Sequence, residues 1–323
     1  TLLGSTAGDS FSGTDASANT LIGQGSGTAI TTGDNNTAIG RYSLRTNTTG
    51  SNNTALGRSA LDQATTADNN TGVGYQALYS NTTGTRNTAV GAYSLDANTT
   101  SNDNTALGWN ALGANTGAGN TAVGSRALDA NTTGTRNTSM GDLSLSTNTT
   151  GNDITAFGYN ALYLSTGDGN TAVGSRSQDA TTTGENNTSI GDFSLTNNTT
   201  GGENVAVGSS ALAANTTGPS NVAIGYLALT ANTTGDQNVA LGTTALDANT
   251  TGRNGIAVGH TALGVNTTGD NNIAIGAGAL QNNATADNNV AMGYQALKLN
   301  TTGGYNTAIG KSALAANTTG GGN

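Results

Sequence analysis

The sequence predicts an all-β protein, a parallel β-solenoid of about nineteen coils. Three observations predict this fold class: a 17-residue repeat along nearly the whole chain, an apolar residue followed by glycine at one fixed position of each repeat, and an Asn-Thr-Thr-Gly segment at another. Seventeen residues are too few for a pair of packed helices, and they suit one coil of short strands and tight turns.

The repeat follows the pattern N-(T/V)-A-(I/V/L)-G-x-x-(A/S)-L-x-x-N-T-T-G-x-x. Its anchoring glycines are Gly4, Gly23, Gly40, Gly57, Gly74, Gly91, Gly108, Gly124, Gly141, Gly158, Gly174, Gly191, Gly208, Gly225, Gly242, Gly259, Gly276, Gly293 and Gly310. The steps are 17 residues except an initial 19 and two of 16, where the Asn-Thr-Thr-Gly segment contracts at residues 115–117 and 165–167. Deletions at one fixed place indicate a loop.

Within a unit, residues 36–39 form a β-type run that ends at Gly40. Residues 43–44 are expected to begin a second short strand, and residues 47–50 supply turn chemistry. Gly40 and Gly50 fit positions that need a positive φ or a close backbone approach. Coils stacked at the strand spacing of ~4.8 Å predict a rod on the order of 90 Å long.

The whole chain, 1–323, is expected to be one repeat-array domain, with divergent first coils in 1–34 and regular repeats in 35–323. The chain starts and stops in phase with the repeat, and its last unit is an ordinary one. Because isolated solenoids need polar caps on their terminal coils, we expect the polypeptide to continue or a further subunit to stack coaxially.

Two ranks, meaning sets of residues at the same position of successive coils, are apolar. The rank before the glycine runs through Ile39, Leu56, Val73, Val90, Leu107, Val123, Met140 and Phe157 to Ile309, and the rank four residues after the glycine runs from Leu44 to Leu314, broken only by Gln178. Both ranks are expected to be buried. Between them, the rank of Ala38 holds only Ala, Gly or Ser in the regular repeats, which predicts a narrow coil.

The strand pattern also bears on assembly. Side chains alternate along a strand, so Thr37 and Ile39 share one face and Ala38 lies on the other. The Thr37 rank becomes apolar in later units, at Val205, Val222, Val239, Ile256, Ile273 and Val290. Both faces are therefore expected to be at least partly buried, the second against another chain. A broader monomeric coil that encloses both faces is the alternative.

Asparagines form two further ranks. They are Asn36, Asn53, Asn70, Asn87, Asn104, Asn120, Asn137, Asn170, Asn187, Asn204, Asn221 and Asn238, and Asn47, Asn81, Asn98, Asn131, Asn148, Asn198, Asn215, Asn232 and Asn249. Stacked amides bond to one another and to turn backbone, so a structural role is expected. Glycans on successive coils would collide at the ~4.8 Å strand spacing, which argues against dense modification of the Asn-Thr-Thr triplets.

The segments Asn36-Thr37-Ala38-Ile39-Gly40 and Asn221-Val222-Ala223-Ile224-Gly225 resemble the head repeats of YadA-like trimeric autotransporter adhesins, and similar arrays occur in phage and virus tail-fibre shafts. The resemblance covers most of the chain, from about Asn19 to Asn323. It implies a left-handed parallel β-roll, three chains packed side by side as a homotrimer, and an extracellular place at a cell or virion surface for attachment. Those heads use a shorter unit, and this chain shows no heptad stalk and no membrane-anchoring barrel.

Eight aromatic residues fall one or two positions after an anchoring glycine and are candidates for surface binding: Tyr42, Tyr75, Tyr93, Trp109, Tyr159, Phe193, Tyr226 and Tyr294. Amphipathic, rigid rings can stack on sugars, which suggests host surface glycans or matrix as partners. Alternatively, they cover the first turn or seal contacts between chains.

The sequence offers little catalytic chemistry. It has no cysteine and only one histidine, His260, so catalytic triads and His-pair or thiolate metal sites are excluded, and no cofactor is expected. Acidic residues gather before the strand, where a cation or a solvated turn would explain them: Asp34, Asp68, Asp103, Asp236, Asp270 and Asp287. A net charge of −9 with ten scattered Lys and Arg argues against nucleic acid, and no apolar run is long enough to span a membrane.

These patterns predict a non-enzymatic extracellular structural fibre or adhesin shaft. Ice binding is an alternative, because regular Thr ladders on a flat solenoid face can order water and the chain has such a rank at Thr37, Thr54, Thr71, Thr88, Thr105, Thr121 and Thr138. The patterns are also compatible with a carbohydrate-binding solenoid and with the subunit of a head-to-tail filament.

Overall fold

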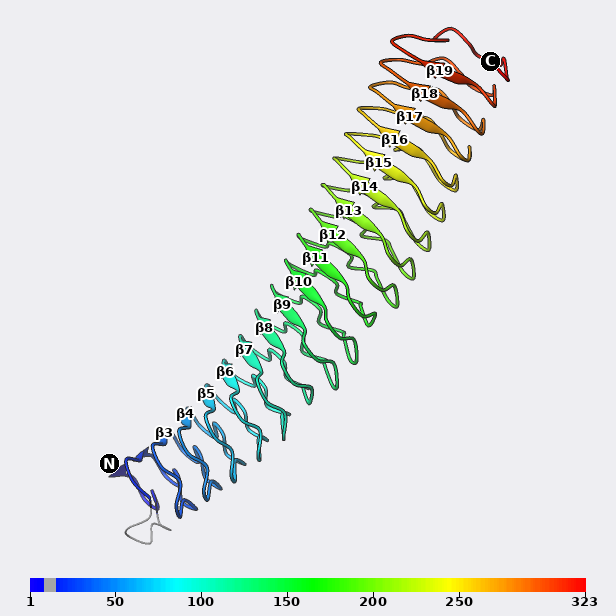
Figure 1. The fold of residues 1–323 in the computed structure, drawn as a ribbon. Coiled ribbons are helices and arrows are strands. Elements are labelled where there is room, and N and C mark those ends of the chain that lie inside the picture. Colours follow the sequence, from blue (N-terminus) through cyan, green and yellow to red (C-terminus); the bar gives the residue numbers. More distant parts are fainter. Residues whose placement is uncertain (9–15) are drawn as a thin grey trace. The chain divides into compact units, whose positions relative to one another are not determined.

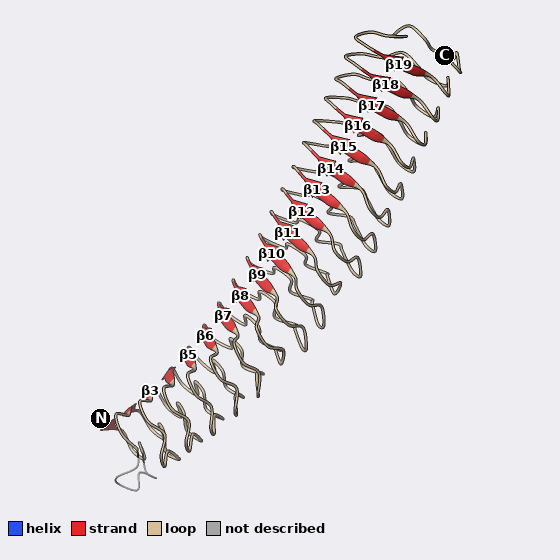
Figure 2. Cartoon of the chain, viewed as in Figure 1, coloured by secondary structure: helices blue, strands red, loops and turns tan. Residues whose placement is uncertain are grey.

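The computed structural model describes residues 1–8 and 16–323. The chain is an all-β parallel solenoid, as the sequence predicts, and it comprises two compact units, Thr1–Asn160 and Ala161–Asn323. Figure 1 labels the strands, and Figure 2 shows that each strand is a short part of its coil, with turns and loops making up the rest.

In the N-terminal unit, Thr1–Asn160, the strands are β1 (Leu2–Leu3), β2 (Thr20–Ile22), β3 (Thr37–Ile39), β4 (Thr54–Leu56), β5 (Thr71–Val73), β6 (Thr88–Val90), β7 (Thr105–Leu107), β8 (Thr121–Val123), β9 (Thr138–Met140) and β10 (Thr155–Phe157). In the C-terminal unit, Ala161–Asn323, they are β11 (Thr171–Val173), β12 (Thr188–Ile190), β13 (Val205–Val207), β14 (Val222–Ile224), β15 (Val239–Leu241), β16 (Ile256–Val258), β17 (Ile273–Ile275), β18 (Val290–Met292) and β19 (Thr307–Ile309).

Within each unit, consecutive strands pair in parallel and in the register of the repeat. Thr37 lies opposite Thr54, and Val222 lies opposite Val239. Where the repeat contracts to 16 residues, Thr105 still pairs with Thr121, because the missing residue falls at 115–117, outside every strand. The deletions therefore do mark a loop.

The core of each coil is formed by three ranks, two of small residues and one of leucine. Ala38, Ser43 and Leu44, and their counterparts in the coils up to residue 297, are fully buried, whereas Leu314 in the last coil is 39% exposed. The predicted burial of the Leu44 rank is confirmed, but the predicted burial of the rank before the glycine is wrong. Leu56 is 44% exposed and Met140 is 43% exposed. Since side chains alternate along a strand, turning the alanine inward turns the residue before the glycine outward.

No second strand begins at residues 43–44, which also corrects the sequence-based expectation. These residues lie in a turn, in which Tyr42 has φ 61° and Leu44 has φ 51°, both in the left-handed region. An extended strand needs φ well below zero. This conformation also explains why the rank contains leucine and never valine or isoleucine, because branching at Cβ makes a positive φ more costly.

The anchoring glycine is required by space as well as by conformation. Gly40 has φ 135°, and a Cβ placed on it would lie 2.5 Å from the carbonyl oxygen of Gly57 in the next coil. No side chain fits at that approach, so the rank contains glycine alone.

The asparagine ranks are structural, as predicted. The Oδ1 atom of Asn36 accepts hydrogen bonds from the backbone N of Asn53 (3.0 Å) and from its Nδ2 (3.1 Å), and Asn53 Nδ2 also donates to Ala67 O (2.7 Å). In the second rank, Asn98 Nδ2 donates to Asn81 Oδ1 at 2.9 Å. These amides are buried. The Nδ2 atoms that a glycan would modify are therefore enclosed and already hydrogen-bonded.

One coil of the C-terminal unit departs from this pattern. Gln178 occupies the leucine rank and is fully buried, yet neither of its amide atoms has a hydrogen-bond partner. In the same coil, Thr181 takes the place of the second asparagine, and its hydroxyl is also buried without a partner. Unpaired buried polar groups are costly, so this coil is expected to be the least stable part of the core.

Candidate functional site

Of the eight candidate aromatic residues, the structure brings the rings of Tyr75 and Tyr93 together, after the neighbouring strands β5 and β6. Tyr42 follows β3 and is linked to them by Arg58, which lies over the Tyr75 ring and also acts on Tyr42; all three tyrosines are half-buried. The remaining five stand on other coils of the two units and are between 38% and 56% exposed: Trp109, Tyr159, Phe193, Tyr226 and Tyr294. Phe193 lies under the guanidinium of Arg176, at 5.7 Å.

The three tyrosines share their surface with three arginines. We call this group the arginine–tyrosine cluster; it consists of Arg41, Tyr42, Arg45, Arg58, Tyr75 and Tyr93. The central carbon of the Arg41 guanidinium lies 4.5 Å from the centre of the Tyr42 ring, and Arg41 Nη2 donates a hydrogen bond to the Tyr42 hydroxyl at 3.0 Å. The Arg45 guanidinium lies 5.0 Å from the centre of the same ring.

The cluster extends along the next coils. The Arg58 guanidinium lies 5.6 Å from the centre of the Tyr75 ring, and the Tyr75 and Tyr93 rings meet edge to face with their centres 5.2 Å apart. Both arrangements are attractive, because the ring face is electronegative and the ring edge electropositive. The aromatic rings therefore hold the guanidinium groups in place.

The charges of the cluster act on Tyr42. Its pKa is lowered by the hydrogen bond from Arg41, and further by the positive charges of Arg41, Arg45 and Arg58. By contrast, burial and the neighbouring Tyr75 raise the pKa of Tyr93. Arg41, Arg45 and Arg58 thus all act on Tyr42, although the charge of Arg45 is offset by its ion pair with Asp62 at 2.9 Å.

Arg45 of the cluster and most arginines outside it are paired with a carboxylate. The pairs in the described residues are Arg45–Asp62, Arg86–Asp103, Arg126–Asp129, Arg136–Asp153 and Arg253–Asp236. Arg41 and Arg58, both exposed, have no carboxylate partner in the part of the chain that the structure describes. The sequence-based description of the basic residues as scattered missed this cluster. The available signal was the separation of Arg41 and Arg58 by one 17-residue repeat, which puts both in one rank.

A second feature is the outer strand face, which consists of the side chains at the first and third positions of each three-residue strand. In β13–β18 both positions are Val, Ile, Leu or Met, and the third-position side chains reach 37% exposure at Ile224 and 44% at Leu241. In β3–β9 the first position is threonine instead, with Thr88 and Thr105 exposed. The outer strand face is thus apolar in β13–β18 of the C-terminal unit, whereas it mixes threonine with apolar residues in β11, β12 and β19 and in β3–β9 of the N-terminal unit.

The acidic residues before the strands connect successive coils. Asp34, Asp68 and Asp287 accept hydrogen bonds from backbone N–H groups of the preceding coil, at 2.6 to 2.8 Å. Asp270 does the same for Arg253, whereas Asp103 and Asp236 form ion pairs. These carboxylates therefore connect neighbouring coils. They are engaged in hydrogen bonds and ion pairs between coils, and neither a shared cation nor simple solvation accounts for them.

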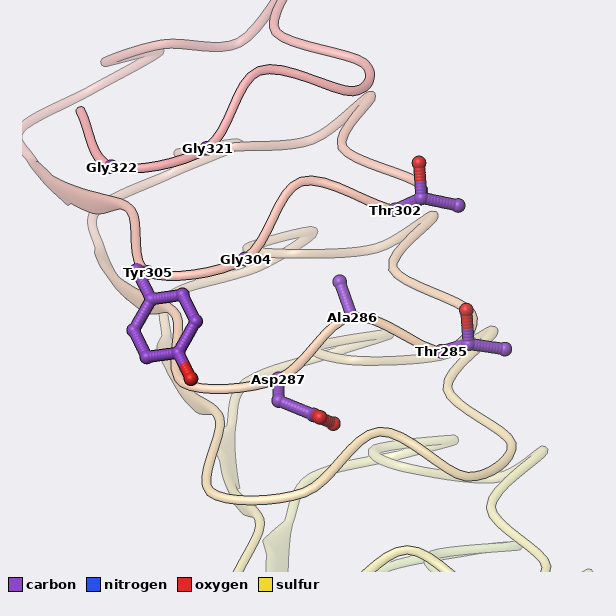
Figure 3. A pocket seen from close by; sticks show the side chains of 8 residues that line it. All are labelled: Thr285, Ala286, Asp287, Thr302, Gly304, Tyr305, Gly321 and Gly322. Carbon is purple, nitrogen blue, oxygen red and sulfur yellow. The ribbon is translucent and has the colours of Figure 1, made fainter.

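The C-terminal unit has a pocket of ≈ 620 Å³ in the segment before the strands. It is lined by Thr285, Ala286, Asp287, Thr302, Gly304, Tyr305, Gly321 and Gly322. Figure 3 shows Tyr305 and Asp287 on neighbouring coils, with the Asp287 carboxylate pointing away from the Tyr305 ring, while three glycines leave bare backbone. The pocket presents one carboxylate, one phenol and two threonine side chains.

Within residues 1–8 and 16–323, no three His, Asp or Glu side chains gather in a way that could hold a metal ion. The same residues contain no helix that is both long and apolar enough to cross a membrane. No known protein family matches the chain, and no curated protein matches its sequence.

Proposed function

We propose that this chain is a non-enzymatic structural fibre or adhesin shaft, displayed outside the cell at a cell or virion surface, and that it assembles with copies of itself. The observation that supports assembly most directly is the apolar outer strand face of β13–β18. Parallel sheets are normally covered on both faces, and a continuous exposed apolar surface marks a contact site.

A second copy of the chain fits this face best. The apolar side chains repeat at the spacing of the strands, from the Val222 and Ile224 pair to the Val290 and Met292 pair. A partner with the same repeat matches that spacing at every coil, and identical chains form closed symmetric assemblies. The resemblance to trimeric adhesin heads favours three copies, with the outer strand faces turned toward a common axis.

Light scattering of the intact protein tests the assembly, with about three chains per particle expected. Ile224→Glu together with Leu241→Glu places like charges in the contact and should yield monomers. Thr234→Glu is the matched control, because Thr234 is exposed at a different corner of the same coil. A wild-type protein that is monomeric at all concentrations contradicts the assembly, as does a double variant that remains trimeric.

A second candidate function is ice binding by the N-terminal unit. Its outer strand face presents threonines in register at the first strand position, as in the pairing of Thr88 with Thr105. Each has a hydroxyl and a methyl group, and the strands repeat at about 4.8 Å, a regular array that can order water. A concentrated solution that neither shapes ice crystals nor shows thermal hysteresis rules this candidate out.

A further inference from the structure

We propose that the arginine–tyrosine cluster of the N-terminal unit is a binding site for an acidic glycan, a sugar bearing a sulfate or carboxylate group. The inference deepens the proposed attachment function and rests on it, because it gives the surface-displayed chain a ligand. The proposal depends on three observations: Arg41 and Arg58 have no carboxylate partner in the described residues, tyrosine rings hold them, and the chain as a whole is negatively charged.

Arg41 and Arg58 differ from the other arginines of this unit. Arg86 and Arg136 each place Nε and Nη2 against the two oxygens of an aspartate, whereas Arg41 and Arg58 meet no described carboxylate. A guanidinium presents five N–H donors in a planar fork that matches an oxyanion. Since the other forks are filled by protein carboxylates, these two forks are available for a carboxylate or sulfate from outside.

The rings prepare the site for binding. A guanidinium stacked on a ring face keeps its in-plane N–H groups accessible, so Arg58 on Tyr75 remains able to donate hydrogen bonds. Arg41 on Tyr42 does so with the N–H groups other than the one that Nη2 donates to the Tyr42 hydroxyl. Holding a long side chain in place before binding removes part of the entropy cost of binding. Unpaired, exposed arginines without such rings would have to be ordered by the ligand.

The position of the arginines suits a sugar oxyanion. Arg41 and Arg58 follow β3 and β4, which pair in register, so their backbones stand one strand spacing apart, about 4.8 Å. The hydrogen bond from Arg41 and the charges of Arg41, Arg45 and Arg58 lower the pKa of Tyr42, and Arg45 is itself paired with Asp62. The Tyr75 and Tyr93 rings continue the surface with amphipathic edges, which suit the mixed apolar and hydroxyl faces of a sugar ring.

The net negative charge of the chain favours a short acidic ligand over a long polyanion. The net charge is −9, so a long polyanion such as a nucleic acid meets repulsion on either side of this small positive cluster. A short glycan with one acidic group places its charge at the arginines and its neutral hydroxyls elsewhere. An acidic peptide has the charge but lacks the flat sugar face.

The test is a binding titration of the intact protein with 3′-sulfolactose, 3′-sialyllactose and lactose. We expect at least one of the two acidic sugars to bind about tenfold or more tightly than lactose, and to weaken as salt is added, because exposed charge contacts are screened. The difference between sulfolactose and sialyllactose identifies whether sulfate or carboxylate is preferred. Equal binding of lactose, no binding of either acidic sugar, or tighter binding of a glutamate oligomer overturns the proposal.

Variants locate the site. Arg41→Gln with Arg58→Gln should weaken binding of the preferred acidic sugar about tenfold or more, whereas Arg86→Gln, which removes an exposed but ion-paired arginine of the same unit, should leave it unchanged. Spectroscopic titration of the tyrosines provides a second readout, since Arg41→Gln should raise the pKa of Tyr42. A double variant that binds as wild type refutes the site.

The result is separable from the proposed assembly. Light scattering on the same samples reports the oligomeric state. A monomer that binds the acidic sugar through Arg41 and Arg58 contradicts self-assembly and supports the binding site. A trimer that does not bind the sugar supports self-assembly and contradicts the binding site.

Discussion

The buried glutamine of the coil that contains β11 allows a direct test of how the solenoid core is stabilised. Gln178 is fully buried in a rank that otherwise contains leucine, between Leu162 and Leu195, and both of its amide atoms lack partners. Its backbone already has the conformation of that rank, with φ 55° against 53° at Leu162. Gln178→Leu therefore introduces no new strain and nearly conserves volume.

The expected gain follows from two contributions. Each unpaired buried polar group costs ~1–3 kcal/mol, and removing the amide removes two of them. A fully buried leucine side chain contributes ~1.5–3 kcal/mol relative to an exposed one. We expect the free energy of unfolding of the C-terminal unit to rise by about 3 kcal/mol or more, which corresponds to an increase of ~6–12 °C in Tm for a unit of this size.

Thermal and urea denaturation followed by circular dichroism measure the effect. The protein concentration is held constant, because self-association would shift the transition. Hydrogen exchange localises the effect, since the backbone N–H of Gln178 bonds to Ser194 O in the next coil and should exchange more slowly in the variant. Leu212→Gln is the reciprocal control and should create the same defect in a regular coil. If Gln178→Leu leaves Tm unchanged while Leu212→Gln lowers it, the reasoning about unpaired amide atoms is wrong.

Three further outcomes are expected from the same denaturation measurements. Gly276→Ala should lower the free energy of unfolding by at least ~3 kcal/mol, because its Cβ would lie 2.6 Å from backbone atoms of Gly293. Gly278→Ala is the control: its Cβ would have no atom closer than 3.5 Å, so it should cost only ~1 kcal/mol for the left-handed backbone. Equal costs would contradict the close-approach argument. Leu229→Val should lower the free energy of unfolding by ~2–4 kcal/mol, because Leu229 is buried at φ 53° and a β-branched side chain resists that conformation. Leu229→Met should lower it by less than ~1.5 kcal/mol. A valine variant as stable as the methionine variant would falsify the conformational account of the leucine rank. Burial raises the pKa of Asp247 above its ordinary 3.8, so the folded chain binds that proton more tightly than the unfolded chain, and the associated stability is complete below pH 3.8 and lost as the pH rises through the folded pKa. Asp247→Asn should therefore be more stable than wild type at pH 7, and this advantage should disappear in acid. A difference in stability that does not depend on pH would show that the carboxyl group is not the cause.

The aromatic candidates show how far sequence reasoning reaches for the site. Their position after the anchoring glycine was visible in the repeat, but the repeat does not say which of them meet. Tyr75 and Tyr93 occupy different positions of their coils, one and two residues after the glycine, and their ring centres still lie 5.2 Å apart. The cations were harder to predict, since Arg45 reaches the Tyr42 ring from a third position of the coil.

The sequence by itself determined the period, the parallel register and the structural role of the asparagines. A 17-residue repeat leaves one coil per unit, and the amides that recur in nearly all coils, such as Asn36 and Asn53, have partners only if the coils stack in register. The sequence also determined that Thr37, Ala38 and Ile39 alternate between two faces.

Only the tertiary structure decided which face points inward. Alternation is equally compatible with Ile39 inside or Ala38 inside, and the larger apolar side chain was the expected core. The decision lies in the turn after the glycine, where left-handed backbone at Tyr42 and Leu44 returns the leucine to the interior. Leucine fills the space above the strand, so only alanine fits beneath it, and the larger side chains of the strand are left on the outer face.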